Sequence, residues 1–536
     1  MIRTPPASLI DTPVRQARRQ SVGDLLRRTA LRYPDKIAVI TAQRRVTFRQ
    51  FDEAVNRCAN NLTAKGLRKG DRFAIVSHNC WEFAVLAFAT ARLGVVLVPV
   101  NFMLNAEEIA FVLAHSGARA VAVEDVLVPT VELALTLAEV SDALCGSITL
   151  SDGQPSGPWE LVDAWIDQGD NTAPDVSVDD EDPIRLMYTS GTESRPKGVV
   201  LSSRSLISQY VSCAIDGGMS VDDVELHSLP MYHCAQLDCF FSVDVYLGAT
   251  SIILPSPDPV ELLATIEREK VTKLFCPPTV WISLLRHPDF ETRDLSSLRK
   301  GYYGASPMPA EVLKELSSRL PDVALWNLYG QTEMSPVAAI LGPNEQLSHA
   351  GSAGRAALNV ETRVVDNNDV ELPSGQVGEI VHRSPHATLG YYLDQDKTDA
   401  AFVNGWFHSG DLGHIDEDGF LTVVDRKKDM IKTGGENVAS REIEEALYLL
   451  DGVAEAAVFG VSHPYWVEAV VAVVVPRSGS ALTPEAVTAH TAQTLAGFKR
   501  PKYVILTDSL PKNPSGKILK KELRLLYADL GQQDLT

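Results

Sequence analysis

The sequence predicts an α/β protein, with a large N-terminal domain of layered α/β subdomains and a small, mobile α+β domain at the C-terminus. From about residue 21 to 430, helical patterns such as TFRQFDEAVNRCANNLTAKG alternate with short apolar runs such as RFAIVS, ARAVAVE, TSIILP and TKLFCPP. This alternation is typical of largely parallel sheets covered by helices. After residue 430 a charged helix, two strand-like runs and a basic tail follow. These elements span roughly a hundred residues, enough for a separate domain.

The N-terminal segment DTPVRQARRQSVGDLLRRTA is basic, and its leucines are spaced for one face of a helix. We predict a solvent-exposed first helix, and a membrane-surface anchor is the alternative that the charge leaves open. The longest apolar run, Phe83 to Val100, is interrupted by Arg92 and Gly94. It is therefore expected to form a buried helix that leads into a strand, and not a membrane span.

The C-terminal elements follow in a fixed order. SREIEEALYLL is expected to be a helix, AEAAVFGV and WVEAVVAVVVP to be strands, and a second helix should run from Thr483 to about Leu495. The charged run from Asp425 to Asp429 separates these elements from the preceding part and is expected to contain a hinge. The predicted domains are 1–427 and 428–536.

The composition limits the function. The chain has 536 residues, 45% hydrophobic and 22% charged, with a formal net charge of -20. This charge argues against nucleic-acid binding, which needs a basic surface, and favours a small-molecule enzyme. The seven cysteines form no CxxC pair and no spacing typical of metal ligands. They are expected to be reduced thiols of a cytoplasmic protein.

The segment MYTSGTESRPKGV, residues 187 to 199, combines hydroxyls, glycines and a lysine. Such a loop can direct backbone N–H groups at phosphate oxygens; a plain surface turn is the alternative. It is not a P-loop, because Pro196 precedes Lys197 and Gly198 follows it, whereas a P-loop lysine is followed by a Ser or Thr that ligates Mg²⁺. A metal ligand would have to come from elsewhere.

Four further segments carry residues that suit nucleotide chemistry. LWNLYGQTEMSP offers the aromatic face of Tyr329 and the oxygens of Thr332 and Glu333. Asp411 in NGWFHSGDLGHID could accept hydrogen bonds from ribose hydroxyls, although a turn aspartate is commoner. DRKKDMIKTGGENVASREIE holds a glycine pair that would let a ligand pass close to the backbone. LPKNPSGKILKKELR places Lys517 on a rigid turn, with a solvated basic tail as the alternative.

Taken together and in order, these segments resemble the adenylate-forming superfamily, specifically acyl-CoA synthetases and 4-coumarate:CoA ligase-like enzymes. The resemblance rests on YTSGTESRPKGV, PMYHCAQ, YYGASPM, NLYGQTE, GWFHSGDL, DRKKDMIKTGGENV and NPSGKILKKELR, and covers nearly the whole chain. It implies the adenylate-forming enzyme fold, with ATP and the acyl substrate bound by residues 1–427. One departure is Glu193 and Ser194, which replace the usual residues of the phosphate loop.

The resemblance also implies roles for individual residues. Tyr329 would stack on adenine, Thr332 would reach the α-phosphate, and Lys517 would bridge the carboxylate and the α-phosphate. The implied catalytic residues are Lys517, Glu333, Thr332 and His233. The implied ATP- and AMP-binding residues are Thr189, Ser190, Gly191, Thr192, Lys197, Gly304, Ala305, Ser306, Asn327, Tyr329, Gly330, Asp411 and Arg426. The implied Mg²⁺ ligands are Glu333 and Thr192.

For the later steps the resemblance implies a hinge, a thiol path and an acyl pocket. Lys428 occupies the position of the family's hinge. The implied coenzyme A contacts are Lys432, Gly434, Gly435 and Asn437. The implied acyl pocket comprises His233, Cys234, Gln236, Trp281, Tyr303 and Val337. Small residues in PMYHCAQ and the lack of an aspartate there favour an apolar acid, of medium or long chain or with a bulky tail.

The predicted function is an ATP-dependent acid–thiol ligase that forms an acyl-AMP and then the CoA thioester, releasing AMP and pyrophosphate. ATP, Mg²⁺ and coenzyme A are the expected cofactors and co-substrates, and nucleic acid is not an expected partner. Two alternatives stay open: a fatty acyl-AMP ligase that loads an acyl carrier protein, and a membrane-associated uptake protein that traps lipid by acylation. A homodimer and weak peripheral membrane contact through the basic N-terminus are also left open.

Overall fold

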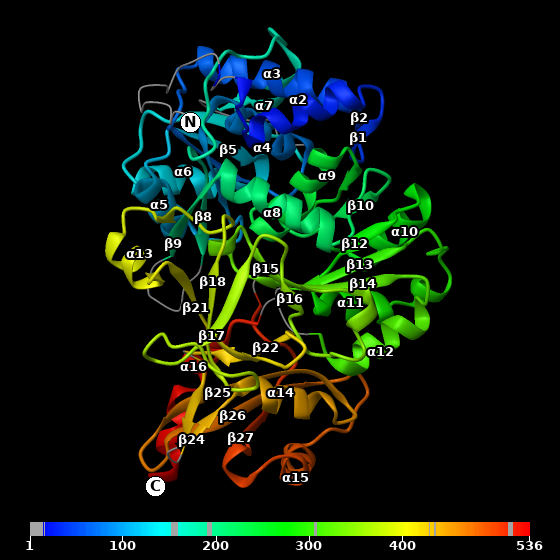
Figure 1. Ribbon diagram of the computed structural model, residues 1–536, viewed down its shortest axis with the longest axis vertical. Helices are drawn as coiled ribbons and strands as arrows, with labels where there is room; N and C mark the ends of the chain where they lie inside the picture. The colour runs from blue at the N-terminus through cyan, green and yellow to red at the C-terminus, as the bar shows by residue number, and fades with distance from the viewer. Residues whose placement is uncertain are drawn as a thin grey trace, which may run out of the picture.

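The computed structural model describes residue 14 and residues 17–151, 159–189, 196–304, 308–427, 429–433, 436–512 and 518–535. Figure 1 shows α/β layers in the upper and middle parts, blue to green, and a smaller domain at the lower end, orange to red. The predicted α/β fold with a large N-terminal and a smaller C-terminal domain is confirmed. Strands described in this part of the chain form four sheets.

The first sheet has the strand order β19-β9-β8-β4-β3-β5-β6-β7. Its strands are β3 (Arg72–Val76), β4 (Val96–Val100), β5 (Ala120–Glu124), β6 (Leu144–Ile148), β7 (Glu160–Leu161), β8 (Pro183–Thr189), β9 (Lys197–Ser202) and β19 (Gly390–Tyr391). The strands from β8 to β7 run parallel, while β9 turns back antiparallel on β8 and pairs with β19. A strand from far along the chain therefore lies beside the β8–β9 hairpin.

Helices cover both faces of this sheet, and their sequences explain where they begin. They are α2 (Val22–Arg32), α3 (Phe48–Ala64), α4 (Trp81–Leu93), α5 (Ala106–Ser116), α6 (Val128–Leu137) and α7 (Val162–Asp167). Capping boxes start α3, at Thr47 and Gln50, and α5, at Asn105 and Glu108. Every residue of α4 is buried, and β4 follows it, so the predicted buried helix leading into a strand is confirmed.

The second sheet has the order β16-β15-β14-β13-β12-β10-β11-β1-β2. Its strands are β1 (Ile37–Ile40), β2 (Arg45–Thr47), β10 (Val224–His227), β11 (Thr250–Ile253), β12 (Lys273–Phe275), β13 (Lys300–Gly304), β14 (Ala324–Gly330), β15 (Val337–Leu341) and β16 (Arg355–Ala356). The helices of this region are α8 (Ser203–Asp216), α9 (Ser242–Leu247), α10 (Pro259–Glu269), α11 (Pro278–Arg286) and α12 (Ala310–Arg319), with a π-helix, η2 (Ala235–Phe241). The inner strands are parallel, so β13 and β14 end at the same edge.

The third sheet is antiparallel and stands between the two α/β layers and the C-terminal domain (Figure 1). It contains β17 (Glu361–Val365), β18 (Gly378–Arg383), β20 (Phe402–Val403), β21 (Trp406–Ile415) and β22 (Leu421–Arg426). Helix α13 (Gln395–Ala401) precedes β20. Strands β21 and β22 bring residues from the predicted ribose site to the end that faces the hinge segment.

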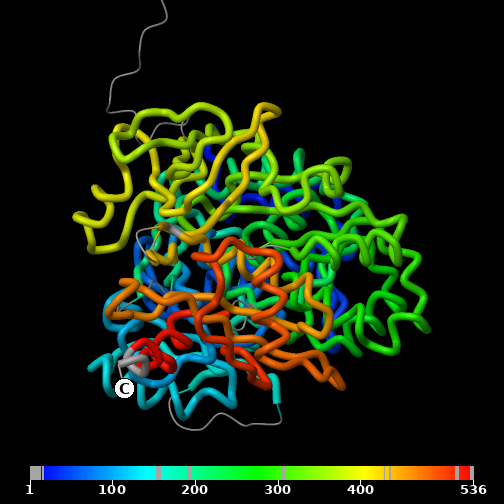
Figure 2. The backbone as a smooth tube through the Cα atoms, turned by 90° about the horizontal axis from the view of Figure 1, so that it is seen from below, coloured from blue at the N-terminus to red at the C-terminus, as the bar shows by residue number. Residues whose placement is uncertain are grey.

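The C-terminal domain has its own sheet, in the order β24-β23-β26-β25, with β27 parallel to β26. Its elements are β23 (Ile431–Thr433), β24 (Glu436–Val438), α14 (Ser440–Tyr448), β25 (Val453–His463), β26 (Val467–Pro476), α15 (Pro484–Thr494), β27 (Tyr503–Leu506) and α16 (Lys520–Leu526). Alternate residues of β25 and β26 fill separate apolar clusters on the two faces of the sheet. The predicted helices and strands of this domain are confirmed, and Figure 2 shows the domain from below.

Among the described residues, Ser440 and Arg441 of helix α14 hydrogen-bond to the preceding part of the chain. The backbone N–H and the hydroxyl of Ser440 both donate to Asp425 Oδ2, at 2.6 and 2.8 Å. The Arg441 guanidinium donates to the carbonyls of Val423 and Gly351, at 2.5 and 3.0 Å. These bonds lie close to the predicted hinge and fix one orientation of the helix relative to β22.

The basic first helix is packed into the fold. Val22, Leu25 and Leu26 of α2 are at most 1% exposed and belong to the main core cluster. Arg19 pairs with Asp24 at 2.7 Å. Leu25 and Leu26, which the sequence spaces on one face of the helix, are therefore covered by protein, whereas Leu31 at the end of α2 is 75% exposed. No helix in the described ranges is long and apolar enough to cross a membrane.

Candidate nucleotide-binding site

Predicted site residues stand at the carboxyl ends of three strands. Strand β8 ends at Thr189, β13 at Gly304 and β14 at Gly330. Because β13 and β14 are parallel neighbours, their ends meet at one edge of the sheet, the place where α/β folds bind ligands. The short 3₁₀ helix η4 (Thr332–Met334) follows β14 directly. The topology thus gathers the predicted adenine and phosphate residues of this sheet.

The predicted phosphate loop joins β8 to β9. Thr189 and Lys197 are partners in the antiparallel register of the two strands, so they hold the two ends of the loop next to each other. The loop's Ser190, Gly191 and Thr192 lie outside the described residues, and so does the unusual Glu193. The Lys197 ammonium lies over the ring of Tyr391, 5.3 Å from its centroid.

Two predicted glycines have packing reasons of their own. A Cβ on Gly304 would lie 2.5 Å from the Leu328 carbonyl oxygen, so only glycine lets β13 approach β14 here. Gly330 has φ +156°, and a Cβ would lie 1.9 Å from the Pro336 carbonyl oxygen. Ala305 and Ser306, also predicted to face adenine, lie outside the described residues.

Tyr329, Asp411 and Arg426 form one network. The Tyr329 hydroxyl donates to Asp411 Oδ2 at 2.7 Å, and Arg426 Nε lies 3.2 Å from Asp411 Oδ1. Asp411 and Arg426 are register partners in β21 and β22. Burial, reinforced by the Asp411 carboxylate, raises the pKa of Tyr329 well above its ordinary value, so the phenol stays protonated and donates. The three side chains are oriented by one another.

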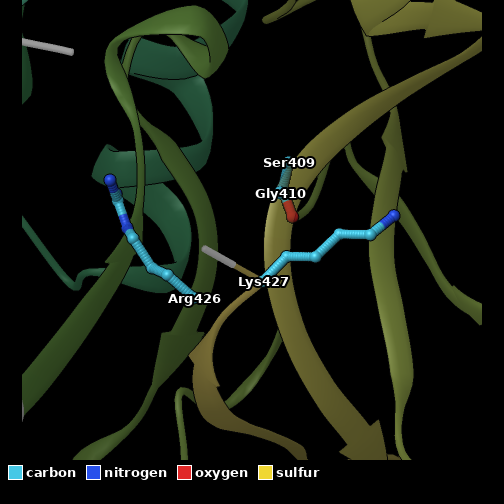
Figure 3. A pocket seen from close by; sticks show the side chains of 4 residues that line it. All are labelled: Ser409, Gly410, Arg426 and Lys427. Atoms are coloured by element: carbon cyan, nitrogen blue, oxygen red, sulfur yellow. The ribbon is translucent and has the colours of Figure 1, made fainter. Parts of the chain in front are cut away.

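A cavity of about 300 Å³ lies beside this network, lined by Ser409, Gly410, Arg426 and Lys427. Figure 3 shows the side chains of Arg426 and Lys427 pointing away from each other, with Ser409 and Gly410 between them on the neighbouring strand. The Lys427 ammonium forms an ion pair with Glu379, 3.0 Å from its Oε2. Arg426 is therefore the cation that remains on the side of Asp411.

Asn327 takes a supporting position in β14. Its Nδ2 donates to the Ser352 carbonyl at 2.8 Å, which ties the strand to the loop that precedes β16. Tyr303, its register partner on β13, faces the second core cluster. Strand β14, which carries the predicted nucleotide residues, is thus bonded to β13 and to the loop that contains Ser352.

Glu333 and Thr332 of η4 lie between the two sheets. The Thr332 hydroxyl is 3.3 Å from Cys234 Sγ. Glu333 is 9% exposed; its Oε1 accepts a hydrogen bond from the Tyr391 hydroxyl at 2.8 Å, and its backbone carbonyl accepts one from the Thr388 N–H at 2.8 Å. Burial raises the pKa of Cys234 to about 12, so this neighbour is a neutral thiol.

The surroundings of Glu333 fit a divalent cation. Its carboxylate is largely buried, and among the described residues it has no ion-pair partner. Carboxylate and hydroxyl oxygens are the ligands that Mg²⁺ takes in proteins. Thr192, the second predicted ligand, lies outside the described residues. Of the two predicted Mg²⁺ ligands, the structure therefore describes only Glu333.

A second acidic cluster, Glu225, His227 and Asp244, brings its ligand atoms within 4.8 Å of one another. The Lys273 ammonium occupies it, 2.7 Å from Glu225 Oε2 and in contact with Asp244. All four side chains are fully buried. A resident cation of the protein thus already balances this charge, and the cluster is a structural ion pair.

The predicted acyl-pocket residues divide into two groups. His233, whose ring centroid lies 4.6 Å from that of Tyr232, adjoins Cys234, and Cys234 contacts η4 through Thr332. Val337 is buried in the same core cluster as Cys234. Of these three residues, Cys234 contacts Thr332 directly.

The other three have structural tasks. The Gln236 amide donates to His227 Nδ1 at 2.7 Å and its oxygen accepts from the Leu229 N–H at 3.3 Å. Trp281 Nε1 donates to the Tyr302 carbonyl, and the Tyr303 hydroxyl to Gln346 Oε1. Trp281 and Tyr303 belong to the second core cluster. The predicted pocket role of these three residues stays a prediction.

The predicted coenzyme A segment is the β23–β24 hairpin of the C-terminal domain. Lys432 and Asn437 are register partners in it, and the Lys432 N–H donates to Glu468 at 2.6 Å. Gly434, Gly435 and the hinge residue Lys428 lie outside the described residues. So does Lys517, although Lys512 and Ile518 on either side form an antiparallel bridge.

Sequence reasoning missed Tyr391 and Thr388, which contact Glu333. They lie more than fifty residues from it: Tyr391 is part of LGYYLD, and Thr388 directly precedes this segment. Neither residue belongs to a nucleotide-type motif. The aromatic pair Tyr391–Tyr392 was the available signal. It does not reveal a partner, because contacts between distant segments depend on the strand pairing of β19 with β9.

Comparison with known proteins identifies the family. The family model described as AMP-binding enzyme matches residues 26–392, and the one described as AMP-binding enzyme C-terminal domain matches residues 442–517. The chain is 36% identical over 509 residues to feruloyl-CoA synthase from an Amycolatopsis species, covering 95% of this chain and 99% of that protein.

Two further relatives agree over the same extent. Long-chain-fatty-acid–CoA ligase FadD13 of Mycobacterium tuberculosis (strain ATCC 25618 / H37Rv) is 34% identical over 511 residues, with 95% of this chain and 99% of that one covered. The crystal structure of ATP-bound MatB from Rhodopseudomonas palustris superimposes with a TM-score of 0.87 at 31% identity, with 95% and 99% covered. The chain therefore belongs to the AMP-binding enzyme family, as a member of the adenylate-forming, ATP-dependent acyl-CoA ligases.

Proposed function

We propose that this protein activates an apolar carboxylic acid, a medium- or long-chain or bulky fatty acid, as an acyl-AMP and transfers the acyl group to the thiol of coenzyme A. The observation that carries the proposal is the network of Tyr329, Asp411 and Arg426 beside the Thr332–Glu333 turn. It joins a flat aromatic side chain, a carboxylate and hard oxygen ligands at one sheet edge.

The nucleotide would bind to a site that is already ordered. Asp411 would accept hydrogen bonds from the ribose hydroxyls, and its orientation is set beforehand by Tyr329 and Arg426. The Tyr329 ring would lie against adenine, with Gly304, Ala305 and Ser306 opposite. A preorganised site does not have to reorganise when the ligand arrives, which is the main source of electrostatic catalysis.

The polyphosphate would lie along the β8–β9 loop, against Thr189, Ser190, Gly191, Thr192 and Lys197. Glu333, with Thr192, would hold Mg²⁺. When bound, this ion neutralises negative charge on the phosphate oxygens and on the departing pyrophosphate. Lys197 adds a fixed positive charge next to Glu333, since both contact Tyr391.

In the first step a carboxylate oxygen of the acid attacks the α-phosphorus and the bond to pyrophosphate breaks, which leaves acyl-AMP. Thr332 would donate to an α-phosphate oxygen, and Lys517 would attract both reacting anions. In the second step the thiolate sulfur attacks the acyl carbon, and AMP leaves with the bonding electron pair. Positioning and charge neutralisation supply most of the rate in such phosphoryl chemistry.

The acyl side would be formed by His233, Cys234 and Val337. Burial keeps the Cys234 thiol neutral, so it offers an uncharged, small surface beside Thr332. No aspartate occurs in PMYHCAQ, so a substrate ammonium would lack a partner there. An uncharged tail therefore suits the site best.

The C-terminal domain, residues 428–536, would serve the two steps in two orientations about Lys428. Lys517 would act in adenylation, and the β23–β24 hairpin with Lys432, Gly434, Gly435 and Asn437 would then guide the thiol. Within the described part of the chain, α14 and β22 are joined by the bonds of Ser440 and Arg441, and breaking these would let the domain change orientation.

The acceptor thiol belongs either to coenzyme A or to an acyl carrier protein. Basic residues of the C-terminal domain are candidates for the phosphates of coenzyme A, but Lys499 already pairs with Glu442 at 2.6 Å and Lys520 with Glu444 at 2.8 Å. Lys502 lies over the Trp466 ring, 5.9 Å from its centroid. Lys502 and Arg500 are further candidates for these phosphate contacts. An acyl carrier protein is the alternative acceptor.

A membrane-associated uptake role is less well supported. It rested on the basic N-terminal helix, of which Leu25 and Leu26 are buried in the core. All seven cysteines are free thiols, and six of them are buried. We therefore propose a cytoplasmic enzyme.

The deciding experiment is a pyrophosphate-release screen over fatty, aryl and sterol-derived acids. Each acid is tested alone, with coenzyme A, and with a phosphopantetheinylated acyl carrier protein. We expect release with an aliphatic acid and a CoA thioester as the product. Release only with aryl acids would overturn the substrate class, and thioester formation only on the carrier protein would overturn the acceptor. No release with any acid would contradict the ligase assignment.

A further inference from the structure

Tyr391 lies between two groups of the proposed polyphosphate site that are far apart in sequence. It is the second residue of β19, and it pairs with Val199 of β9. Strand β9 begins at Lys197, and Glu333 belongs to η4. Tyr391 contacts both side chains, through different parts of its own.

The hydroxyl of Tyr391 acts on Glu333. It donates to Oε1 at 2.8 Å. Oε2 has no hydrogen-bond partner within the described ranges. A carboxylate held by one oxygen has its rotamer fixed and presents the other oxygen in one direction, which is how an outer hydrogen-bond partner orients a metal ligand.

The ring of Tyr391 acts on Lys197. The ammonium lies 5.3 Å from the ring centroid, within the range of a cation–π contact. The side chain of lysine is long and flexible, so a contact of this kind narrows the region that the charge samples. That region borders the loop proposed to hold the polyphosphate.

The backbone holds Tyr391 firmly in this place. Its N–H donates to Thr398 Oγ1 at 2.9 Å. Gly390 before it has φ +127°, and a Cβ there would lie 2.8 Å from Thr398 Cγ2. Thr388 adds two bonds, from its N–H to the Glu333 carbonyl and from its hydroxyl to the Val200 carbonyl. The segment therefore links η4 to β9 independently of the tyrosine side chain.

We propose that Tyr391 is a positioning residue for adenylation, whose hydroxyl directs the Glu333 carboxylate toward the divalent cation and whose ring directs the Lys197 ammonium toward the polyphosphate. This inference rests on the proposed function, in which Glu333 holds Mg²⁺ and Lys197 faces ATP. The hydroxyl and the ring can be tested separately. Phenylalanine keeps the ring but lacks the hydroxyl, and leucine lacks both.

Tyr392 is the matched control. It follows Tyr391 directly, and its side chain packs with a third apolar cluster, beside β3–β5 and α5, with its ring 5.7 Å from that of His115. Loss of its hydroxyl removes the same chemical group from the neighbouring position without touching Glu333 or Lys197. Tyr392→Phe should therefore behave as the unaltered protein does.

The first measurement is Mn²⁺ binding in the presence of ATP, followed by electron paramagnetic resonance, so that turnover is not needed. Tyr391→Phe should weaken Mn²⁺ binding about tenfold, the scale found when an outer partner of a metal ligand is removed. The second is ATP binding in EDTA by calorimetry. Tyr391→Phe should leave it unchanged, whereas Tyr391→Leu should weaken it about threefold through the lost ring contact.

Glu333→Gln separates failure of this inference from failure of the proposed function. If Glu333→Gln weakens Mn²⁺ binding and Tyr391→Phe does not, Tyr391 has no positioning role. If neither variant weakens it, Glu333 is not the metal ligand, and that part of the proposed function fails together with the inference. In the double variant the Tyr391→Phe effect should disappear; an undiminished effect would place the hydroxyl's action elsewhere. Unfolding temperatures within about 4 °C of the unaltered protein, a shift of about 1–2 kcal/mol, show that each variant is folded.

Discussion

The nucleotide side of the proposed site and the C-terminal domain differ in how they are held. Tyr329, Asp411, Arg426, Glu333 and Tyr391 are oriented by direct hydrogen bonds and ion contacts to one another. They come from strands β14, β19, β21 and β22 and the turn after β14. Each member is fixed by a partner from another segment, so the group is rigid before any ligand binds.

The C-terminal domain has its own sheet and its own apolar clusters. Helix α14 is joined to the preceding part by bonds to Asp425, Val423 and Gly351. Such a link is weak enough to change orientation, because a typical hydrogen bond contributes only about 0.5–1.5 kcal/mol net. The side chains that would bind the nucleotide are therefore held rigidly. The C-terminal domain, which would change orientation between the two half-reactions, is joined to the preceding part through these bonds of α14.

The largest expected effect comes from removing Lys517, which the C-terminal domain is proposed to bring to the nucleotide site. Lys517→Ala should reduce acyl-AMP formation about a hundredfold or more, because one preorganised charge is lost. Thioester formation from supplied acyl-AMP should be largely retained. Lys512→Ala is the matched control, since Lys512 is a nearby lysine paired with Glu455 at 2.6 Å. Equal damage to both half-reactions by Lys517→Ala would argue against two orientations.

The hinge itself is the next test. Lys428→Pro fixes φ near -65° and removes a backbone N–H, so one orientation should be trapped. Pyrophosphate release should survive, while CoA thioester formation falls at least about tenfold, or roughly 1.4 kcal/mol on that step. Lys428→Ala, which keeps the N–H and the backbone freedom, should leave both steps near normal. If thioester formation keeps pace with adenylation in the proline variant, the rotation does not occur at Lys428.

We expect low pH to lower the free energy of unfolding through His382, which lies near Tyr329. Burial lowers the pKa of His382 to about 3, helped by the nearby His386, and the His382 ring lies 6.3 Å from that of Tyr329. The folded protein keeps His382 neutral, whereas the unfolded chain protonates it below about pH 6.5. The stabilising contribution is therefore complete above that pH and is lost progressively as pH falls from 6.5 toward 3.

The measurement is the free energy of unfolding against pH. His382 should contribute a loss of up to about 1.4 kcal/mol per pH unit between pH 6 and 4. In His382→Gln this part of the slope should be absent, whatever the variant's stability at pH 7. An unchanged slope would mean that His382 is not held neutral in the folded protein.

The smallest expected effect concerns the link near the hinge. Ser440→Ala removes the hydroxyl bonds to Asp425 and Lys520 but keeps the backbone N–H bond to Asp425. The orientation should lose about 1 kcal/mol of stabilisation. Hydrogen–deuterium exchange should rise in residues 423–427 and at the start of α14, while β14 and β21 exchange as before. Faster exchange in β14 as well would mean that the two regions are not independently held.

Local patterns made much of the fold predictable. The apolar runs that became β3, β5, β11 and β12 and the elements α14, β25, β26 and α15 were expected, because each follows its own period along the chain. The site could be predicted only as a set of residues. That Gln236 bonds to His227, and that Trp281 and Tyr303 lie in the second core cluster, depends on side-chain direction, which spacing along the chain does not specify.

The sequence by itself determined the α/β layers, the separate C-terminal domain and the order of the nucleotide-type segments, since all of these follow from periodicity, composition and short motifs. Only the tertiary structure decided that Tyr391 reaches both Glu333 and Lys197, that Asp411 is held by Tyr329 and Arg426, and that Leu25 and Leu26 of α2 are covered. Strand pairing and burial couple residues far apart in sequence, and a contact of that kind leaves no local trace in the chain.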